Sequence, residues 1–175
     1  MIRLATLNDM DHIWSLRLKT SALLKSRGVD QWQYHKPEKE TFIKDINDLE
    51  FYVYELDQKI IGMIAIKSGV EHTYLDIFEG KWEKEAPYFT IHRLAVDQAY
   101  LGKQISVKLM TFAHELAMSK SIYYMRIDTH EDNLKAQKLF VSMGYQLRGY
   151  ILLEKDHPGE RKRLAYDLTL DGGLK

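Results

Sequence analysis

Two histidines and one aspartate have side chains that could take part in proton transfer at neutral pH. His92 lies inside the apolar stretch YFTIHRLAV, residues 88–96, and His130 follows Asp128 by two residues. Imidazole gains and loses protons near neutral pH, so either histidine could act as a general base, with Asp128 orienting it. The alternatives are a hydrogen-bonded core histidine at position 92 and a turn or capping residue at position 130, and the sequence leaves them open.

A second segment could bind phosphate. The stretch VDQAYLGKQISVKLMTFAHELA, residues 96–117, indicates a strand end, a loop and a helix. Phosphate is held mainly by backbone N–H groups at a helix N-terminus, where about half a positive elementary charge accumulates. These amides are present whatever the side chains are. The pattern predicts a phosphate site, and its alternative is a plain loop opening a core helix; the site residues would be Leu101, Gly102, Lys103, Gln104, Ile105 and Ser106.

The elements that must position these groups follow from hydrophobic periodicity and turn residues. Their order is strand, two helices, three strands, helix, strand, helix and two strands, with one crossover between the strands at 88–96 and 122–128. Alternation along the first of these strands predicts that His92, Leu94 and Val96 share one face. At the start of the last strand, Arg161, Lys162 and Arg163 are expected to be solvated edge charges and not a nucleic-acid patch.

Composition limits the classes of function. The chain has 175 residues, which suggests one domain over 1–175, and its 25 Lys and Arg residues balance 25 Asp and Glu residues. The balance gives no reason to expect a nucleic-acid or membrane partner. Without cysteine the chain has no disulfide and no cysteine-ligated zinc, and we expect no metal. It begins with no signal-peptide pattern and has no apolar run of about 20 residues, so we expect a cytoplasmic protein.

Three stretches in order carry a family resemblance: IHRLAV at 91–96, YLGKQIS at 100–106 and DTHEDNLKAQKLFVSMGY at 128–145. With the order of elements, they resemble the GNAT superfamily of acyl-CoA-dependent N-acyltransferases over nearly the whole chain. IHRLAV together with RIDTHEDN further resembles a bacterial subgroup of uncharacterised members. The resemblance implies an α/β fold of the α+β type, with a mixed, mostly antiparallel sheet of six to seven strands flanked by about four helices.

The resemblance also implies an activity. An acetyl group would pass from acetyl-CoA to a primary amine of a small molecule or peptide, by direct attack in a ternary complex. The backbone of Leu94, Ala95 and Val96 would face the cofactor arm, Asn133 would contact it, and homodimers are common among relatives. Asn133 could equally be a simple helix cap.

The chain departs from the family pattern at two consequential positions. Gln104 replaces the first glycine of the phosphate loop. Phe140 stands where the family commonly has a tyrosine that protonates the thiolate, and it could be a cleft residue or a core aromatic. These departures keep open a catalytically weak acyl-CoA-binding sensor or partner module, and a purely structural domain that binds no CoA.

The acceptor is the least determined part. In the family, the region after the first helix borders the acceptor cavity, and aromatic and polar groups there suit ligand contact. The residues concerned are Trp32, Gln33 and Tyr34. An acidic, irregular segment at 69–87, with Glu71, Asp76 and Glu79, could attract a cationic amine or could be a solvated loop.

Overall fold

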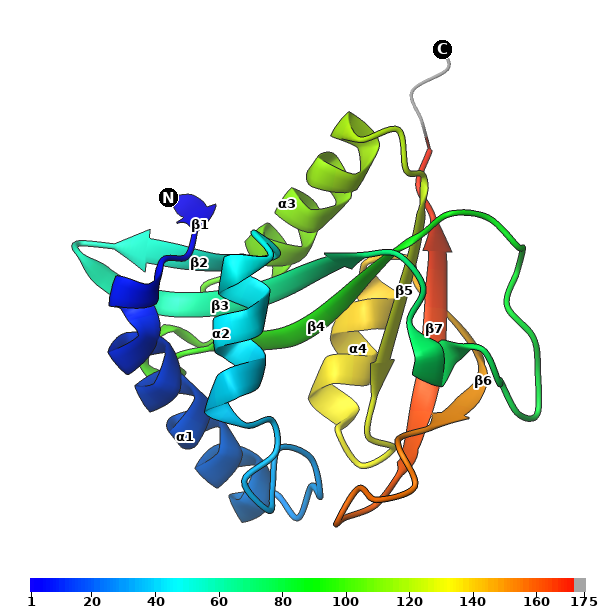
Figure 1. Ribbon diagram of the computed structural model, residues 1–175, viewed down its shortest axis with the longest axis horizontal. Coiled ribbons are helices and arrows are strands. Elements are labelled where there is room, and N and C mark those ends of the chain that lie inside the picture. Colours follow the sequence, from blue (N-terminus) through cyan, green and yellow to red (C-terminus); the bar gives the residue numbers. More distant parts are fainter. Residues whose placement is uncertain (172–175) are drawn as a thin grey trace.

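The computed structural model describes residues 1–171. Seven strands form one sheet in the order β1-β2-β3-β4-β5-β7-β6, in which β4 and β5 are parallel and all other neighbours are antiparallel (Figure 1). The strands are β1 (Ile2–Leu4), β2 (Phe51–Leu56), β3 (Lys59–Ser68), β4 (Phe89–Val96), β5 (Tyr124–Thr129), β6 (Gln146–Leu152) and β7 (Lys162–Thr169). The predicted mixed, mostly antiparallel sheet is confirmed.

Four α-helices cover the two faces of the sheet. They are α1 (Met10–Ser26), α2 (Lys39–Asn47), α3 (Ile105–Ser119) and α4 (Leu134–Ser142). Figure 1 shows α1 and α2 on the near face, and α3 and α4 on the far face. Each face has its own apolar core, because Phe42 and Phe51 pack with the α1–α2 layer, whereas Leu109 and Phe140 belong to the α3–α4 layer. No helix within residues 1–171 is long and apolar enough to cross a membrane.

A bulge in β4 changes which residues share a face. Met63 of β3 pairs with Ala95 and Ala65 pairs with His92, so a single β3 residue lies opposite both Arg93 and Leu94. Arg93 takes up the extra residue with a φ of 52°. The prediction of one common face for His92, Leu94 and Val96 is therefore wrong, because one inserted residue reverses the alternation. Leu94 and Val96 pack toward the α3–α4 layer, and Ala95 packs toward α1 and α2.

The segment between β3 and β4 is anchored to the sheet by aromatic contacts. The guanidinium of Arg126 lies 4.2 Å from the Trp82 ring centre and 4.1 Å from that of Tyr88. Nη2 of Arg126 also donates to the Lys84 carbonyl, at 3.1 Å. Within this segment, a short 3-10 helix, η2 (His72–Tyr74), packs Tyr74 against Trp82. These contacts hold an otherwise irregular loop over the same face that α1 and α2 cover.

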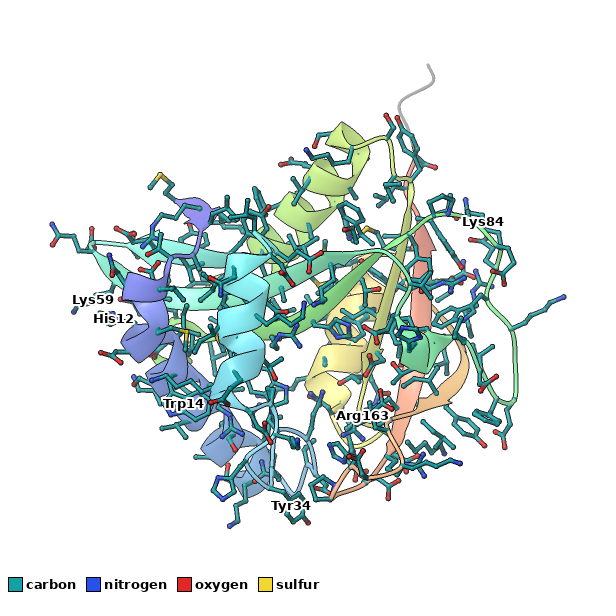
Figure 2. All side chains as sticks on the ribbon, in the orientation of Figure 1. His12, Trp14, Tyr34, Lys59, Lys84 and Arg163 are labelled. Carbon is teal, nitrogen blue, oxygen red and sulfur yellow. The ribbon has the colours of Figure 1, made fainter. Side chains whose placement is uncertain are left out.

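The end of the chain corrects one expectation about charge. β7 is not an edge strand, since it lies between β5 and β6. Arg163 is 3% exposed, so it is not the solvated edge charge that the sequence suggested. Figure 2 shows Arg163 within the lower part of the molecule, whereas Tyr34 lies at its rim.

Candidate active site

The site is built where β4 and β5 separate. Their pairing ends at Ile91 and Ile127, and the bulge at Arg93 follows directly on β4. Two adjoining cavities, of about 630 and 330 Å³, occupy the space around the diverging strands. They meet at five residues that line both: Thr20, Leu24, Leu94, Asn133 and Ala136.

The smaller cavity contains the predicted phosphate loop. Leu94, Ala95 and Val96 line it, as do all the predicted loop residues except Lys103, namely Leu101, Gly102, Gln104, Ile105 and Ser106. Lys103 instead places its ammonium 5.0 Å from the Tyr100 ring centre. Three cationic side chains that sequence reasoning did not single out also line this cavity: Lys19, Arg27 and Lys135. They come from α1, its C-terminal end and α4, so no local motif connects them to the loop.

The amides of this loop are available to a ligand. The first α3 amide with a backbone acceptor is that of Lys108, which donates to the Gln104 carbonyl at 3.0 Å. Five amides at this turn could face an anion, and within residues 1–171 they donate to no backbone carbonyl. They are the amides of Gly102, Gln104, Ile105, Ser106 and Val107. Phosphate oxygens suit such a set of donors at the positive end of a helix.

Gln104 adopts a backbone conformation that favours glycine. Its φ is 59° and its ψ 21°, in the left-handed region, where it caps α3. A glycine at this position would therefore relieve backbone strain as well as allow close approach. No hydrogen bond involves the Gln104 side chain within the described chain, so the conformation is set by the loop and not by that side chain.

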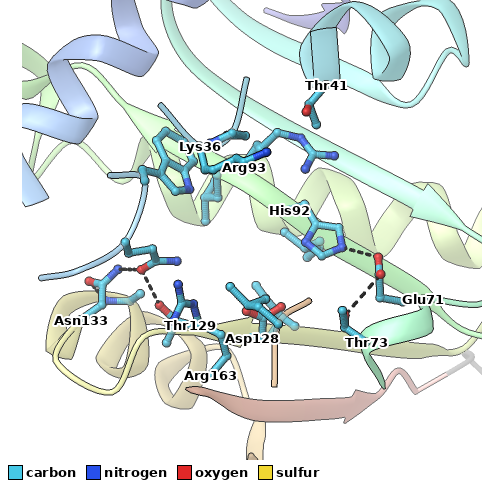
Figure 3. A pocket seen from close by; sticks show the side chains of 18 of the residues that line it. Lys36, Thr41, Glu71, Thr73, His92, Arg93, Asp128, Thr129, Asn133 and Arg163 are labelled. Carbon is cyan, nitrogen blue, oxygen red and sulfur yellow. Dashed lines mark hydrogen bonds and ion pairs between the residues drawn. The ribbon is translucent and has the colours of Figure 1, made fainter. Parts of the chain in front are cut away.

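The larger cavity holds a histidine–glutamate pair. Nε2 of His92 lies 2.9 Å from Oε2 of Glu71, and the Thr73 hydroxyl donates to the other oxygen of Glu71 at 3.3 Å (Figure 3). Burial opposes ionisation of Glu71, but the hydrogen bond and charge of His92 outweigh it and lower the pKa of Glu71 to about 2. An ionised carboxylate only accepts hydrogen bonds, so a neutral His92 carries its proton on Nε2 and presents an unprotonated Nδ1.

Asp128 is in the same cavity but does not orient His92. Its Oδ1 accepts the hydroxyl proton of Tyr74 at 2.6 Å. Burial first, and then the charge of Asp128, raise the pKa of the Tyr74 phenol, so this tyrosine stays a hydrogen-bond donor. Glu71, which the sequence suggested only as a possible amine attractant, has the orienting position that was assigned to Asp128.

His130 is outside both cavities. Its side chain is buried, and Nδ1 accepts the amide of Asp132 at 3.1 Å in the turn before α4. This geometry corresponds to the turn residue that the sequence left as an alternative. The catalytic interpretation of His130 therefore has no support from its position.

Asn133 lies where the two cavities meet and links α4 to the loop after α1. Its Oδ1 accepts the Ala136 amide at 3.3 Å and so caps α4, while Nδ2 donates to Oε1 of Gln31 at 2.9 Å. The same Gln31 oxygen accepts the hydroxyl proton of Thr129 at 3.2 Å (Figure 3). Sequence reasoning missed Gln31, for which the only signal was its place next to Trp32.

The predicted acceptor loop is only partly in the cavity. Trp32 lines it, with a φ of 61°. Gln33 instead turns its amide toward the carbonyls of Ser21 and Gln31, and Tyr34 is exposed at the rim. Gln33 and Tyr34 line neither cavity, so Trp32 and Gln31 are the loop residues that can meet an acceptor.

Phe140 combines both environments that the sequence allowed. It lines the larger cavity, and its ring packs edge-on against Tyr166 with centres 5.5 Å apart. Among the residues common to both cavities, Thr20 has the only hydroxyl, and it donates to the Leu16 carbonyl at 2.8 Å. Hence none of the described side chains at the junction is an evident acid for a leaving thiolate.

The fold and the two adjoining cavities are those expected of the acyl-CoA-dependent N-acyltransferases that the sequence resembles. Residues 16–145 match the model of the Acetyltransferase (GNAT) family, and the chain belongs to this family. A GNAT-family acetyltransferase from Streptococcus agalactiae 2603 has a similar structure, with 31% identity, a TM-score of 0.83 and coverage of 97% of this chain and 94% of that one. The chain is thus a GNAT acetyltransferase.

Sequence relatives agree with this assignment. The uncharacterised N-acetyltransferase YesJ of Bacillus subtilis (strain 168) is 22% identical over 170 residues, which is 89% of each chain. Streptothricin acetyltransferase of Escherichia coli is 25% identical over 116 residues, covering 65% of this chain and 58% of that protein. At lower structural identity, the PaiA N-acetyltransferase from Thermoplasma acidophilum, solved in complex with coenzyme A, shares the fold with a TM-score of 0.68 at 17% identity, covering 97% of this chain and 98% of that one.

Proposed function

We propose that the chain transfers the acetyl group of acetyl-CoA to a primary amine by direct attack in a ternary complex, with His92 as the general base. The observation that carries this proposal is the His92–Glu71 pair, which lies in a cavity that meets the cofactor cavity at Leu94. An acceptor amine in the larger cavity would reach a thioester at the junction. The amine is a small molecule or a peptide amino group.

The smaller cavity fits the cofactor. Its free amides at residues 102 and 104–107 suit a pyrophosphate, and the lysines and arginine around them add positive charge. The pantetheine arm would follow Leu94, Ala95 and Val96 on the side of β4 that has lost its pairing with β5. Asn133, which already joins the two cavities through Gln31, would contact that arm.

Removal of the proton and stabilisation of the developing charges then have named groups. Nδ1 of His92 removes a proton from the ammonium, and Glu71 stabilises the imidazolium that forms. Beyond Ile91, the edge of β4 that faces β5 has no strand partner and offers amides to the carbonyl oxygen as it gains negative charge. The C–S bond breaks as the new C–N bond is completed, the thiolate leaves, and the second proton that the nitrogen sheds passes to this thiolate. A thiol of this kind has a pKa of about 8.5, so its thiolate leaves at neutral pH without an acid.

Acetyl-CoA titration and amine-dependent thiol release test the proposal together. The wild-type protein should be stabilised by acetyl-CoA in a thermal-shift assay and should release thiol with a suitable amine. His92→Gln should lower this rate by about 10²–10⁴-fold, the usual contribution of a general base, without changing acetyl-CoA affinity. His72→Gln, at an exposed histidine next to Glu71, is the control. An unchanged rate in His92→Gln would show that the base is elsewhere.

The absence of a hydroxyl on Phe140 favours a second candidate, a catalytically weak module that binds acyl-CoA as a sensor or partner. It predicts stabilisation by acetyl-CoA with no thiol release from any amine. A purely structural domain predicts no stabilisation at all. The same two measurements therefore separate the three functions.

A further inference from the structure

Arg163 is a buried cation in the acceptor cavity whose charge is not matched by a contacting carboxylate. Its guanidinium forms no ion pair within residues 1–171, although it is 3% exposed and lines the larger cavity. Asp128, Asp30 and Glu160 act on it only from longer range. Burial of a charged group without a contacting partner is costly, so such a group is usually matched by a ligand or a counter-ion.

One edge of this guanidinium is also free to donate. Nη1 donates to the carbonyls of Glu160 and Lys162, at 2.7 and 2.8 Å. Within the described chain, Nε and Nη2 donate to no group. Parallel N–H bonds from one edge of a guanidinium are the arrangement that binds both oxygens of a carboxylate.

The other cations that line the cavity already have partners. Each lysine or arginine apart from Arg163 forms a salt bridge: Arg93 and Lys67 with Asp45, Lys36 with Glu38, and Lys44 with Asp48. Among the residues that the structure describes, the cavity therefore offers one lysine or arginine without an ion pair. One such charge matches the single charge of a carboxylate better than the double charge of a phosphate.

We propose that the acceptor is an amino carboxylate, whose carboxylate is held by the Nε–Nη2 edge of Arg163 while its amine faces His92. This inference rests on the proposed function, since it names the class of acceptor for the same site. Figure 3 shows Arg163 below Asp128 on one side of the cavity, with His92 and Glu71 on another. The ends of the acceptor would thus be held by different strands, with the amine toward β4 and the carboxylate toward β7.

Paired acceptors test the inference in the wild-type protein. ω-Amino carboxylates of increasing length, from glycine upward, are compared with their amides and with aminoalkylphosphonates of equal length. We expect kcat/KM for the best carboxylate to exceed that of its amide by about ten-fold or more, as charge-assisted hydrogen bonds imply. The best chain length reports the spacing between the amine and carboxylate positions.

Two variants assign this preference to a residue. Arg163→Gln should bring the carboxylate-to-amide ratio close to one. Arg161→Gln should keep the wild-type ratio, because Arg161 does not line the cavity. It is a matched control, since its side chain also donates to backbone carbonyls, those of Leu153 and Glu154. If Arg163→Gln fails to fold, an inhibition experiment on the wild-type protein takes its place. Carboxylates without an amine, and the matching amides, are added to the acetylation reaction, and only the carboxylates should inhibit.

The outcomes separate this inference from the proposed function. Equal use of carboxylates and amides, a preference for phosphonates, or a preference that persists in Arg163→Gln would overturn the inference while acetyl transfer stands. If acetyl-CoA binds but no amine is acetylated, the proposed function fails. Calorimetric binding of amino carboxylates to the CoA complex then decides: binding that is lost in Arg163→Gln supports the carboxylate site, and its absence in the wild-type protein overturns it.

Discussion

Phe140 is the residue at which catalysis and packing meet most directly, because its ring lines the larger cavity while packing against Tyr145 and Tyr166. We expect Phe140→Tyr to raise acetyl transfer about ten-fold or more with unchanged CoA affinity, because a hydroxyl at the cavity could protonate the leaving thiolate. Steady-state thiol release and the melting temperature measure the two effects. A variant destabilised by about 1–3 kcal/mol without faster transfer would mean that the hydroxyl is buried without a partner.

A matched control for this variant is Phe112→Tyr, since Phe112 is a half-buried aromatic on α3 that lines neither cavity. Its turnover should stay at the wild-type rate. A rise in both variants would show a general effect of added hydroxyls and not a thiolate acid at position 140.

At Gln104, the backbone conformation decides whether a change to glycine raises or lowers the stability of the protein. In an ordinary helix start, Gln104→Gly would lose about 0.5–1 kcal/mol of stability. At a φ of 59° the left-handed conformation has the greater effect, because it costs a non-glycine residue about 1–2 kcal/mol. We therefore expect Gln104→Gly to be about 0.5–1 kcal/mol more stable, with CoA affinity unchanged or tighter. Urea unfolding and CoA titration measure this, and a weaker CoA complex would show that the Gln104 side chain binds the ligand.

At this scale, sequence reasoning identified groups by chemistry but not their partners. His92 and Trp32 were predicted as site residues and do line the larger cavity, because residue type and element order suffice to suggest them. The partner of His92 is 21 residues away in an irregular segment, and Arg163 lies on a different strand. Such pairings depend on tertiary contacts, which no local pattern records.

At the level of elements, the bulge in β4 decides what the strand presents to each face. Regular alternation would place His92 with Leu94, whereas the additional residue at Arg93 sets His92 toward Glu71 and Leu94 toward the α3–α4 layer. Glycine is the usual signal for a left-handed bulge residue, and this strand has arginine there. The sequence therefore predicts the strand but not its break in register.

The segment between β3 and β4 holds Glu71 in place beside His92. The amide of Glu71 donates to the Tyr88 hydroxyl at 3.0 Å, and the Tyr88 ring in turn packs on Arg126. Tyr88→Phe removes this acceptor, so we expect a stability loss of about 1 kcal/mol and a lower kcat, because Glu71 is held less firmly against His92. Tyr123→Phe, at an exposed tyrosine, should change neither value. Stability loss with normal kcat would confine Tyr88 to packing.

For the whole molecule, the order of elements determined most of what could be predicted. The crossover between β4 and β5 followed from hydrophobic periodicity. The family, and its sheet flanked by about four helices, followed from the resemblance carried by three motifs, and the structure and comparisons confirm them. The larger cavity did not follow, since it draws residues from α1, α2 and α4, from four strands and from the loops before α2, β4 and β7. A cavity that combines so many segments takes its character from tertiary packing.

Acid stability measures how strongly this assembly depends on the Glu71–His92 pair. The folded-state pKa of Glu71 is lowered from 4.5 to about 2, so its contribution is complete above pH 4.5 and is lost as the pH falls toward 2. Between pH 5 and pH 2, we expect wild type to lose about 1–3 kcal/mol more unfolding free energy than Glu71→Gln, below the full linkage value because 26% of the side chain is exposed. Asp9, whose pKa is also lowered to about 2, by Arg3, contributes equally to both proteins.

Urea unfolding at several pH values measures the difference between wild type and Glu71→Gln. Asp76→Asn, at an exposed carboxylate of the same segment, should follow the wild-type curve. Parallel curves for wild type and Glu71→Gln would show that the pair adds nothing to the folded state, and the orienting role of Glu71 would then have to be withdrawn.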